Sequence, residues 1–417
     1  MREMKDSGVE WIGEIPCDWK LERSQWHLEE VNISNNPIQT NNVLSLTNKL
    51  GVVPYEEKGN QGNKSKENVY EYKLAYPNTI VANSMNILIG SVGLCDYFGC
   101  VSPVYYVFRA KKYNNIKFLN YVFQTVGFQR ELRKYANGIL EIRLRVSSSD
   151  ILKRFIPFPS EIEQQRIAEF LDRECGKIDG LKADIQAQID TLEQYKRSVI
   201  TEAVTHGLNP SAPMKDSGIP WVGQFPTHWA KKKGKYILRY MSKPVKQDDG
   251  VITCFRDGEV TLRSNRREDG FTMADKEIGY QGVDVGDLVV HGMDGFAGAI
   301  GISDSRGKAS PVLNVLNTKQ NKKYIMYYLR SMAYGEVFTA LSTGIRVRSC
   351  DLRWNKLSEL LYPLPPIDEQ NNIVSYIDNQ IARTNEIIAD KKSQIETLDG
   401  YKKSLIYEYV TGKKEVV

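Results

Sequence analysis

The hydrophobic positions of this chain follow two different periods. In two long segments, 160–207 and 366–412, apolar residues recur at alternating spacings of three and four, which is typical of a long helix with one apolar stripe. No proline interrupts either run, a proline sits just before each, and Gly207 or Gly412 stands at the far end, so both carry helix start and stop signals. The pattern predicts two helices of roughly 40 residues, each about 60 Å long if unbroken.

The apolar stripe of each predicted helix can be named residue by residue. The first comprises Ile178, Leu181, Ile185, Gln188, Leu192, Tyr195 and Val199, with Gln188 as its one polar position. The second keeps the phase through Ile387, Gln394, Leu398, Tyr401 and Leu405; Ile388 and Ile395 widen it and Lys391 interrupts it. A long helix with one apolar stripe needs a partner, and we expect the two helices to pair. The alternative is that each packs separately on its own domain.

Shorter apolar runs precede each helix and are bounded by Gly, Pro and Asn, which is typical of β-strands. The expected strands are 43–46, 79–82, 104–108, 251–255 and 288–291. Residues 118–135 and 323–341 have amphipathic helical patterns instead. Each globular part is therefore expected to be mixed α+β, and 208–213 (LNPSAP) has the composition of a short linker.

The chain also repeats itself once. Residues 4–19 (MKDSGVEWIGEIPCDW) match 214–229 (MKDSGIPWVGQFPTHW) at nine of sixteen positions, an offset of 210. The match continues from 81–103 to 289–311 at an offset of 208, and from 157–164 to 363–370 at an offset of 206. This drift indicates a tandem duplication with a few short loop deletions. The period is far longer than that of stacked solenoid repeats.

Composition only slightly narrows the range of possible partners and binding sites. The 417 residues carry a net charge of +5, which permits a nucleic-acid partner without requiring one. The six cysteines are scattered without a CxxC pair and the four histidines lie far apart, which argues against a disulfide framework or a zinc site. With no run of about 18 apolar residues, no membrane span is expected. Unpaired thiols and a polar N-terminus lead us to expect a cytoplasmic protein.

Motifs that would carry chemistry are not evident in the sequence. No GxGxxG follows a predicted strand, and no nucleophile–base arrangement or Asn-Pro-Pro-aromatic motif of an amino-methyltransferase occurs. The segment 301–309 (GISDSRGKA) resembles a phosphate loop only superficially. Its spacing is one residue too long, and Ala309 stands where Ser or Thr would hold magnesium. We therefore expect a chain with no active site, metal or cofactor of its own.

Several loop-like segments combine cations with amide and hydroxyl side chains, the groups that contact phosphates and base edges of DNA. The candidates in the first copy are Thr47, Asn48, Lys49, Lys64, Lys66, Asn83, Ser84, Asn86, Arg143 and Arg145. Those in the second copy are Arg256, Arg263, Arg266, Arg267, His291, Asp294, Arg346 and Arg348. For any single position, the alternative is a solvated surface group.

The two copies differ where these candidates lie. Framework glycines, prolines and apolar residues match, whereas Asn48 stands opposite Arg256 and Asn83 opposite His291. Two domains that share a scaffold but differ in their loops are expected to read two different sequences.

Two motifs of the chain together resemble the specificity subunits of type I restriction–modification systems. One is the opening MKDSGxxWxGxxPxxW. The other is a Pro-x-Pro…Glu-Gln…Ile start to a long helix that ends in Tyr-Lys-(Arg/Lys)-Ser, seen at 157–167 and again at 363–373. The resemblance covers the whole chain, in both halves. One departure is Ser160, where the second copy has Pro366.

The resemblance implies an α+β fold with two pseudo-twofold-related globular α/β target recognition domains separated by two long antiparallel coiled-coil helices. The recognition domains would be 1–156 and 208–362, and the helical spacers 157–207 and 363–417. Trp11, Gly13, Pro16, Trp19 and their partners 210 positions later would be scaffold residues. Each domain would read one half of a bipartite double-stranded DNA site, and the coiled coil would fix the spacing between the halves.

The same resemblance implies partners and a division of labour. The chain would be non-catalytic and would assemble with two methyltransferase subunits, which use S-adenosylmethionine to methylate adenine. Endonuclease/translocase subunits that use ATP and magnesium would complete the complex. Two other hypotheses remain open: a stand-alone sequence-specific DNA-binding regulator, and a structural adaptor that joins proteins through its helices without touching DNA.

Overall fold

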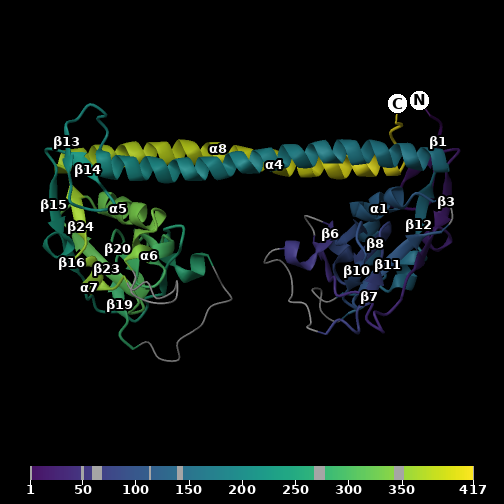
Figure 1. The fold of residues 1–417 in the computed structure, drawn as a ribbon, viewed down its shortest axis with the longest axis horizontal. Helices are drawn as coiled ribbons and strands as arrows, with labels where there is room; N and C mark the ends of the chain where they lie inside the picture. Colours follow the sequence, from purple (N-terminus) through teal and green to yellow (C-terminus); the bar gives the residue numbers. More distant parts are fainter. Residues whose placement is uncertain are drawn as a thin grey trace. The chain divides into compact units, whose positions relative to one another are not determined.

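The computed structural model describes residues 2–47, 51–58, 68–111, 114–138, 144–266, 278–341 and 352–416, and it contains two compact units. The first unit comprises Met1–Ile185 and Lys392–Val417, and the second comprises Gln186–Lys391. Each unit therefore holds one copy of the repeat together with a part of each long helix (Figure 1). The N- and C-termini both belong to the first unit.

The first copy of the repeat folds into short strands, 3₁₀ turns and three short helices before its long helix. These are β1 (Met4–Asp6), β2 (Glu14–Pro16), β3 (Lys20–Arg23), η1 (Ser24–Trp26), β4 (Leu28–Glu30), β5 (Leu44–Thr47), β6 (Gly51–Pro54), η2 (Tyr55–Lys58), β7 (Lys73–Ala75), β8 (Thr79–Asn83), η3 (Asn86–Ile89), β9 (Val92–Cys95), β10 (Gly99–Val101), β11 (Tyr105–Ala110), α1 (Ile116–Gln124), α2 (Val126–Arg133), α3 (Ser148–Leu152), β12 (Phe155–Phe158) and α4 (Glu161–His206).

The second copy repeats this order closely. Its elements are β13 (Met214–Asp216), β14 (Gln224–Pro226), β15 (Ala230–Lys233), η5 (Gly234–Tyr236), β16 (Leu238–Tyr240), β17 (Ile252–Cys254), β18 (Val260–Leu262), η6 (Arg263–Asn265), β19 (Gln281–Val283), β20 (Leu288–His291), η7 (Gly295–Ala297), β21 (Ile300–Ile302), β22 (Gly307–Ala309), β23 (Leu313–Thr318), α5 (Lys322–Tyr334), α6 (Val337–Ala340), α7 (Trp354–Leu357), β24 (Leu361–Leu364) and α8 (Ile367–Val410).

A four-stranded antiparallel sheet forms the centre of each globular part. Its strand order is β4-β11-β8-β9 in the first unit and β16-β23-β20-β21 in the second. Successive residues of a strand face opposite sides, so Ile80 and Ala82 of β8 pack in the same cluster as Phe118 of α1, while Val81 packs with Leu46 and its neighbours on the other face. Burial on both faces explains the continuous apolar run at 79–82. The predicted mixed α/β fold class is confirmed.

The two amphipathic segments each form two helices, where one continuous helix was predicted. In the first unit Thr125 is extended, at φ −67° and ψ 137°, and its side chain accepts a hydrogen bond from Phe128 N, so α1 ends and α2 begins there. In the second unit Glu336 adopts a positive φ of 55° between α5 and α6. A threonine cap competes with helix continuation, and hydrophobic periodicity does not register it.

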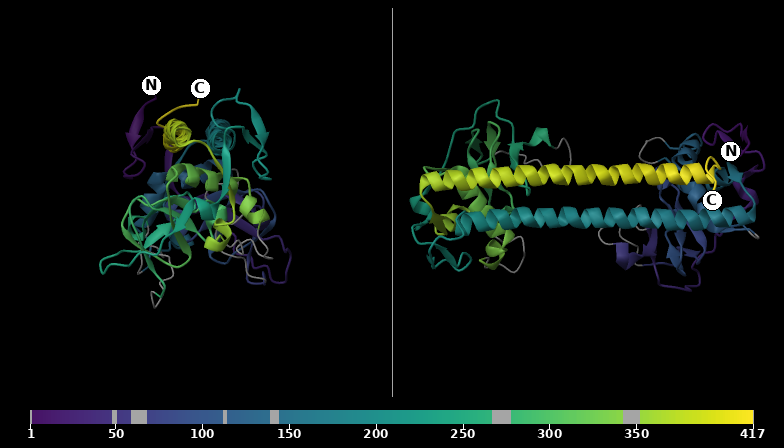
Figure 2. Two further views of the ribbon diagram at one scale, coloured as in Figure 1. Left: turned by 90° about the vertical axis from the view of Figure 1, so that its left-hand side faces the viewer. Right: turned by 90° about the horizontal axis from the view of Figure 1, so that it is seen from above.

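The long helices α4 and α8 contain 46 and 44 residues and run antiparallel wherever they meet inside a unit (Figures 1 and 2). In the first unit Lys402 pairs with Asp179 at 2.6 Å, and the Phe170 and Tyr409 rings lie 4.3 Å apart. In the second unit Lys196, the counterpart of Lys402, donates to Asn385 at 2.8 Å. The expected helix pairing is confirmed.

Each helix also packs on the globular part of its unit, so both arrangements considered from the sequence occur together. Ile167, Leu171 and Ile178 of α4 lie in one core cluster with Ile156 of β12 and Leu405 of α8. The second unit has the equivalent cluster, in which residues from the end of α4 meet the start of α8.

The seam between the helices lies one residue away from part of the predicted stripe. Leu181 and Tyr195, predicted to be in the seam, are about half exposed, at 53% and 47%, whereas Ile189 is buried. Ile387 and Tyr401 of α8 are likewise exposed, and Ile388 is buried in their place. The stripe instead runs through Lys182, Lys196 and Lys402, which are only partly exposed. The aliphatic parts of these lysine side chains occupy seam positions while their charged ends reach outward. A prediction based on apolar residues alone therefore placed the adjacent, exposed residues in the seam.

The two polar interruptions predicted for the stripes contact each other. Lys391 Nζ donates a hydrogen bond to Gln188 Oε1. Gln188 is itself exposed, and Lys391 lies in the same phase as the buried Ile388. The sequence therefore identified a matched polar pair, although it did not show that the two residues meet.

The last tryptophan of each opening motif forms a hydrogen bond with the glutamate at the start of the following long helix. Glu163 Oε2 accepts a hydrogen bond from Trp19 Nε1 at 2.9 Å, and Glu369 Oε1 accepts one from Trp229 Nε1 at 3.1 Å. Both indole rings are almost fully buried. These contacts fix where the opening motif of each copy lies against the helix that follows it.

The glutamine next to each glutamate is a buried polar anchor. Gln164 Oε1 accepts from the N–H of Asn115 at 3.0 Å, and its Nε2 donates to the carbonyl of Pro159 at 3.1 Å. Gln370 makes the two equivalent bonds in the second unit, at 3.0 and 2.9 Å. Each glutamine thus joins the start of a long helix to the N-terminus of α1 or α5.

Glycine ends both long helices, as predicted. Gly207 and Gly412 adopt positive φ values of 78° and 72°, which glycine tolerates best. A Cβ at Gly207 would lie 3.2 Å from the Trp229 ring, and one at Gly412 would clash with Pro16. The opening motif of each unit therefore packs against the end of a long helix, and that close approach requires glycine.

Candidate nucleic-acid interface

The loop after the central strand is built in the same way in both units. β8 ends at Asn83, whose Oδ1 accepts hydrogen bonds from the N–H groups of Met85 (3.0 Å) and Asn86 (3.3 Å). β20 ends at His291, whose Nδ1 accepts from the N–H groups two and three residues later, at 3.2 and 3.0 Å. One side-chain acceptor at the end of the strand therefore shapes the turn that leads into η3 or η7.

The residue after each acceptor ties this loop to two further segments. Ser84 N donates to Val104 O at 3.2 Å, and Ser84 O accepts from Val146 N at 3.1 Å. Gly292 makes the two equivalent bonds at 2.7 and 2.8 Å. Arg145 precedes Val146 and is exposed, so this connection holds a cation near the loop of the first unit.

In the second unit the tip of a β-hairpin lies against the same loop, because a Cβ at Gly298 of the loop would come within 2.7 Å of Arg256 O. A Cβ at Gly301 of β21 would clash with the backbone of Gly258 at the tip of the β17–β18 hairpin. A Cβ at Gly93 of β9 would lie 3.4 Å from Gly51 Cα in the β5–β6 hairpin. Glycine permits these backbone approaches. Residues of the hairpin tip, including Arg256 in the second unit, are thereby brought to the loop.

An ion pair connects the hairpin tip and the loop in the second unit. Arg256 Nη2 donates to Asp294 Oδ1 at 3.0 Å, and the Arg256 side chain is 59% exposed. The backbone N–H of Asp294 is one of the two groups bound by His291. His291, Asp294 and Arg256 therefore form a linear series of contacts from the end of the strand to the surface.

The imidazole of His291 is held in its neutral form. Burial lowers the pKa of His291 below its usual value, and the positive charge of Arg256 acts in the same direction, while Asp294 opposes both. A neutral ring that carries its proton on Nε2 leaves Nδ1 free to accept both backbone hydrogen bonds. This tautomer follows from the two N–H donors that face Nδ1.

Two further arginines of the second unit lie along the same hairpin. Arg266 pairs with Asp257 at 2.8 Å, and its guanidinium carbon lies 4.2 Å from the centre of the Phe255 ring. Arg263 Nε donates to Thr253 Oγ1 at 3.3 Å and lies at the open end of the hairpin. Arg266 therefore lies with Arg256 near the tip, and Arg263 does not.

The first unit presents the amide of Asn86 where the second presents the carboxylate of Asp294. Asn83 and Ser84 are 7% and 4% exposed, so they shape the loop from inside, whereas Asn86 and Arg145 are exposed. Thr47 ends β5 and is largely buried. The candidates that the structure brings together are thus the two loops, the hairpin tip of the second unit and Arg145. Eight predicted residues lie outside the described residues: Asn48, Lys49, Lys64, Lys66, Arg143, Arg267, Arg346 and Arg348.

Sequence reasoning missed the apolar residue Ile89 of the first loop, whereas Met293 lies within the run 291–294 that it singled out. Ile89, the last residue of η3, is 65% exposed, and Met293 is 51% exposed beside Asp294. Met293 stands next to Asp294, outside any strand pattern, whereas Ile89 is flanked by Leu88 and Gly90 and carried no sequence signal. Exposed apolar groups in such a loop suit contact with the methyl group of thymine.

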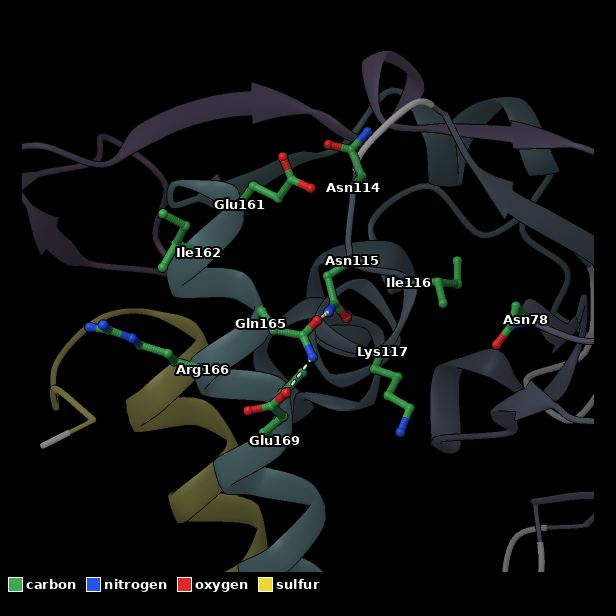
Figure 3. Close-up of a pocket in the computed structure, with 11 residues that line it drawn as sticks. Asn78, Asn114, Asn115, Ile116, Lys117, Glu161, Ile162, Gln165, Arg166 and Glu169 are labelled. Atoms are coloured by element: carbon green, nitrogen blue, oxygen red, sulfur yellow. Dashed lines mark hydrogen bonds between the residues drawn. The ribbon is translucent and has the colours of Figure 1, made fainter.

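A hollow of about 680 Å³ lies in the first unit where α1 meets the start of α4 (Figure 3). Asn115 donates to Gln165, and Gln165 Nε2 donates to Glu169 at 2.5 Å. Lys117 at its rim pairs with Asp172 at 2.6 Å. These polar groups bond to one another and join α1 to α4.

Within the described residues, no three His, Cys, Asp or Glu side chains are placed to hold a metal ion. None of the helices that the structure describes is long and apolar enough to cross a membrane.

Comparison with known proteins identifies one group of relatives. The chain is 19% identical over 321 residues to the specificity subunit of the type I restriction enzyme StySPI from Salmonella potsdam, across 73% of this chain and 67% of that protein. No family model matches the chain.

Solved structures give the same result for the fold. A chain from work on complex assembly and conformational transition of the type I R-M system matches with a TM-score of 0.66 and 12% identity, over 96% of this chain and 99% of that one. The HsdS subunit from Thermoanaerobacter tengcongensis matches with a TM-score of 0.48 and 12% identity, over 98% and 100%. The resemblance indicated by the repeated motifs is confirmed.

Proposed function

We propose that this chain is the DNA sequence-recognition subunit of a type I restriction–modification system and that each unit reads one half of a bipartite site. The observation that carries the proposal is the duplicated loop at the end of β8 and β20. Its backbone hydrogen bonds are equivalent in both units, while its surface carries Asn86 in one and Asp294 with Arg256 in the other. A shared scaffold with different surface groups suits two readers of different sequences.

The chain acts in this proposal without catalysis of its own. Two methyltransferase subunits dock on it, bind S-adenosylmethionine and methylate adenine, and endonuclease subunits supply ATP- and magnesium-dependent cleavage. The relative found by sequence is a type I specificity subunit, and a solved structure with this fold comes from work on the assembly of a type I R-M system, which supports these partners. The chain itself needs no cofactor in this scheme, and it works in the cytoplasm, where bacterial DNA is accessible.

Methylome sequencing tests the proposal directly. Cells that express the chain with its methyltransferase should carry methylated adenines in a single bipartite motif, which is absent without the chain. Replacing residues 41–151 with the matching segment of another relative should change one half-site and leave the other intact. Complete absence of sequence-dependent methylation and DNA binding, with a methyltransferase partner present, would refute the proposal.

The two alternative functions predict other results. A stand-alone regulator would bind a specific sequence without any methyltransferase, and an adaptor would bind proteins but no DNA. Co-purification with a methyltransferase that carries an Asn-Pro-Pro-aromatic motif separates the proposed function from both.

A further inference from the structure

The Arg256–Asp294 ion pair joins the hairpin tip of the second unit to the loop after β20. Arg256 is exposed at the hairpin tip, and one of its Nη2 donors is held by Asp294 Oδ1 at 3.0 Å. A guanidinium has five N–H donors in a fixed plane. No other partner of this guanidinium is found in the part of the chain that the structure describes, so its remaining donors are open to a ligand.

Backbone hydrogen bonds fix the loop that carries Asp294. His291 Nδ1 accepts from Asp294 N at 3.0 Å, and the backbone of Gly292 is fixed by hydrogen bonds on both sides. Asp294 N is therefore bonded to the end of a central strand that is itself buried. An arginine oriented by a carboxylate on a fixed loop loses less conformational entropy on binding than a free surface arginine.

The carboxylate also discriminates between possible ligands. A phosphate beside Asp294 would meet a negative charge close to the arginine, which weakens the attraction. The major-groove edge of guanine presents two neutral acceptors, N7 and O6, that match two parallel N–H donors. The amino group of cytosine donates a hydrogen bond that an aspartate oxygen can accept. A G·C pair therefore fits this ion pair better than the DNA backbone does.

We infer that Arg256, oriented by Asp294, reads a guanine in the half-site recognised by the second unit. This inference rests on the proposed function and names one base of the sequence that it reads. In the first unit Asn86 stands where the second unit has Asp294, and position 48, the counterpart of Arg256, is Asn. The guanine requirement therefore belongs to the second half-site.

Methylome sequencing of variants tests the inference in the assembled complex. Arg256→Ala should lose the guanine preference at one position of the second half-site by roughly 10- to 100-fold, because a bidentate arginine–guanine contact gives discrimination of that order. Asp294→Ala should weaken the same preference. The first half-site should stay unchanged and serves as an internal control. Arg239→Ala removes the same charge from an exposed position on β16 and should leave the whole motif unchanged.

A binding assay separates base reading from a phosphate contact. Once the motif is known, 7-deazaguanine at the candidate position removes the N7 acceptor alone. The wild-type complex should lose affinity for this DNA relative to guanine DNA, and the Arg256→Ala complex should not distinguish the two. If Arg256→Ala lowers methylation evenly with an unchanged motif, Arg256 contacts phosphate and the inference is wrong. If Arg256→Ala relaxes the motif but Asp294→Ala matches the wild type, the orienting role of Asp294 is wrong.

Failure of this inference can be told apart from failure of the proposed function. In the first case the wild-type chain still directs methylation to a bipartite motif, and only the Arg256 variant behaves unexpectedly. In the second case the wild-type chain directs no motif at all.

Discussion

At the scale of single residues, two different side chains at matching positions of the two copies form the same hydrogen bonds. Asn83 and His291 each accept two backbone hydrogen bonds from the loop that follows. The sequence singled out both positions as base contacts. The structure shows that the amide oxygen of one and the ring nitrogen of the other are already used by their own loops. Their effect on DNA reading is therefore expected to be indirect, through the shape of the loop.

The histidine makes the loop after β20 sensitive to acid in a way that the matching loop of the first unit, which has Asn83, is not. The pKa of His291 is lowered by burial, so the unfolded chain takes up a proton near pH 6.5 while the folded loop resists it. The contribution of His291 to stability is full above the unfolded pKa and is lost as pH falls through the folded pKa. His291→Asn, which installs the acceptor found in the first unit, should flatten this dependence.

Urea unfolding of both proteins between pH 8 and pH 5 measures the difference. His27, whose pKa burial also lowers, is present in both proteins, so the difference profile isolates His291. Superimposable pH profiles for the wild type and His291→Asn would show that Nδ1 is not the loop acceptor.

The buried glutamine at the start of α4 has a larger structural effect. Gln164→Leu leaves the N–H of Asn115 and the carbonyl of Pro159 without partners. Each unsatisfied buried group costs about 1–3 kcal/mol, so the loss of two partners should lower the free energy of unfolding by roughly 2–6 kcal/mol. Gln194→Leu, at an exposed position further along α4, is the control and should change it by less than about 1 kcal/mol. Equal losses for the two variants in thermal or urea unfolding would contradict the anchor role.

At the scale of elements, the long helices show why an apolar stripe can be misassigned by one residue. Lys182, Lys196 and Lys402 occupy seam positions with their stems and reach Asp399, Asn385 and Asp179 with their amines. Counting apolar residues treats a lysine as an interruption, so the predicted stripe moved to Leu181 and Tyr195. The long helices and their pairing were predictable because length and period are strong signals. The exact seam depends on the partner helix, and one helix's own sequence does not contain that information.

Lys391 is a seam position at which a more apolar residue should stabilise the pair. It lies in phase with the buried Ile388 and is only partly exposed. Lys391→Leu should raise the stability by about 1 kcal/mol through added apolar burial, which is a shift of roughly 2–4 °C in Tm for a unit of this size. Lys392→Leu, one residue further and exposed, should leave Tm unchanged. A Tm that falls in Lys391→Leu would show that its contact with Gln188 outweighs apolar packing.

At the scale of the whole molecule, the repeat was the most informative signal in the sequence. It predicted two α/β units with the same fold. The hydrogen-bonded pairs Trp19–Glu163 and Trp229–Glu369 explain why these residues recur in both copies. The broken helices at Thr125 and Glu336 were not predictable from periodicity, because the breaks are local: a side-chain cap at Thr125 and a left-handed backbone at Glu336. The proposed DNA-reading surface was predicted only to the level of loops. Which side chains face outward depends on hydrogen bonds between distant segments, such as those of Ser84 with Val104 and Val146.

The long helices carry a prediction about the spacing of the proposed half-sites. If each unit reads one half, the helices that belong to both units set the gap between the halves, because a helix is stiffer than a linker. Seven residues added to α4 after Ile185 and to α8 after Lys391 keep the seam in phase and lengthen each helix by about 10 Å. Methylome sequencing should then show both half-sites unchanged and a gap about three base pairs longer, at roughly 3.4 Å per base pair. The same seven residues inserted within the exposed segment 208–213 should leave the gap as it was. A gap that stays constant in the helix variant, with methylation retained, would mean that the spacing is set by the partner subunits and not by these helices.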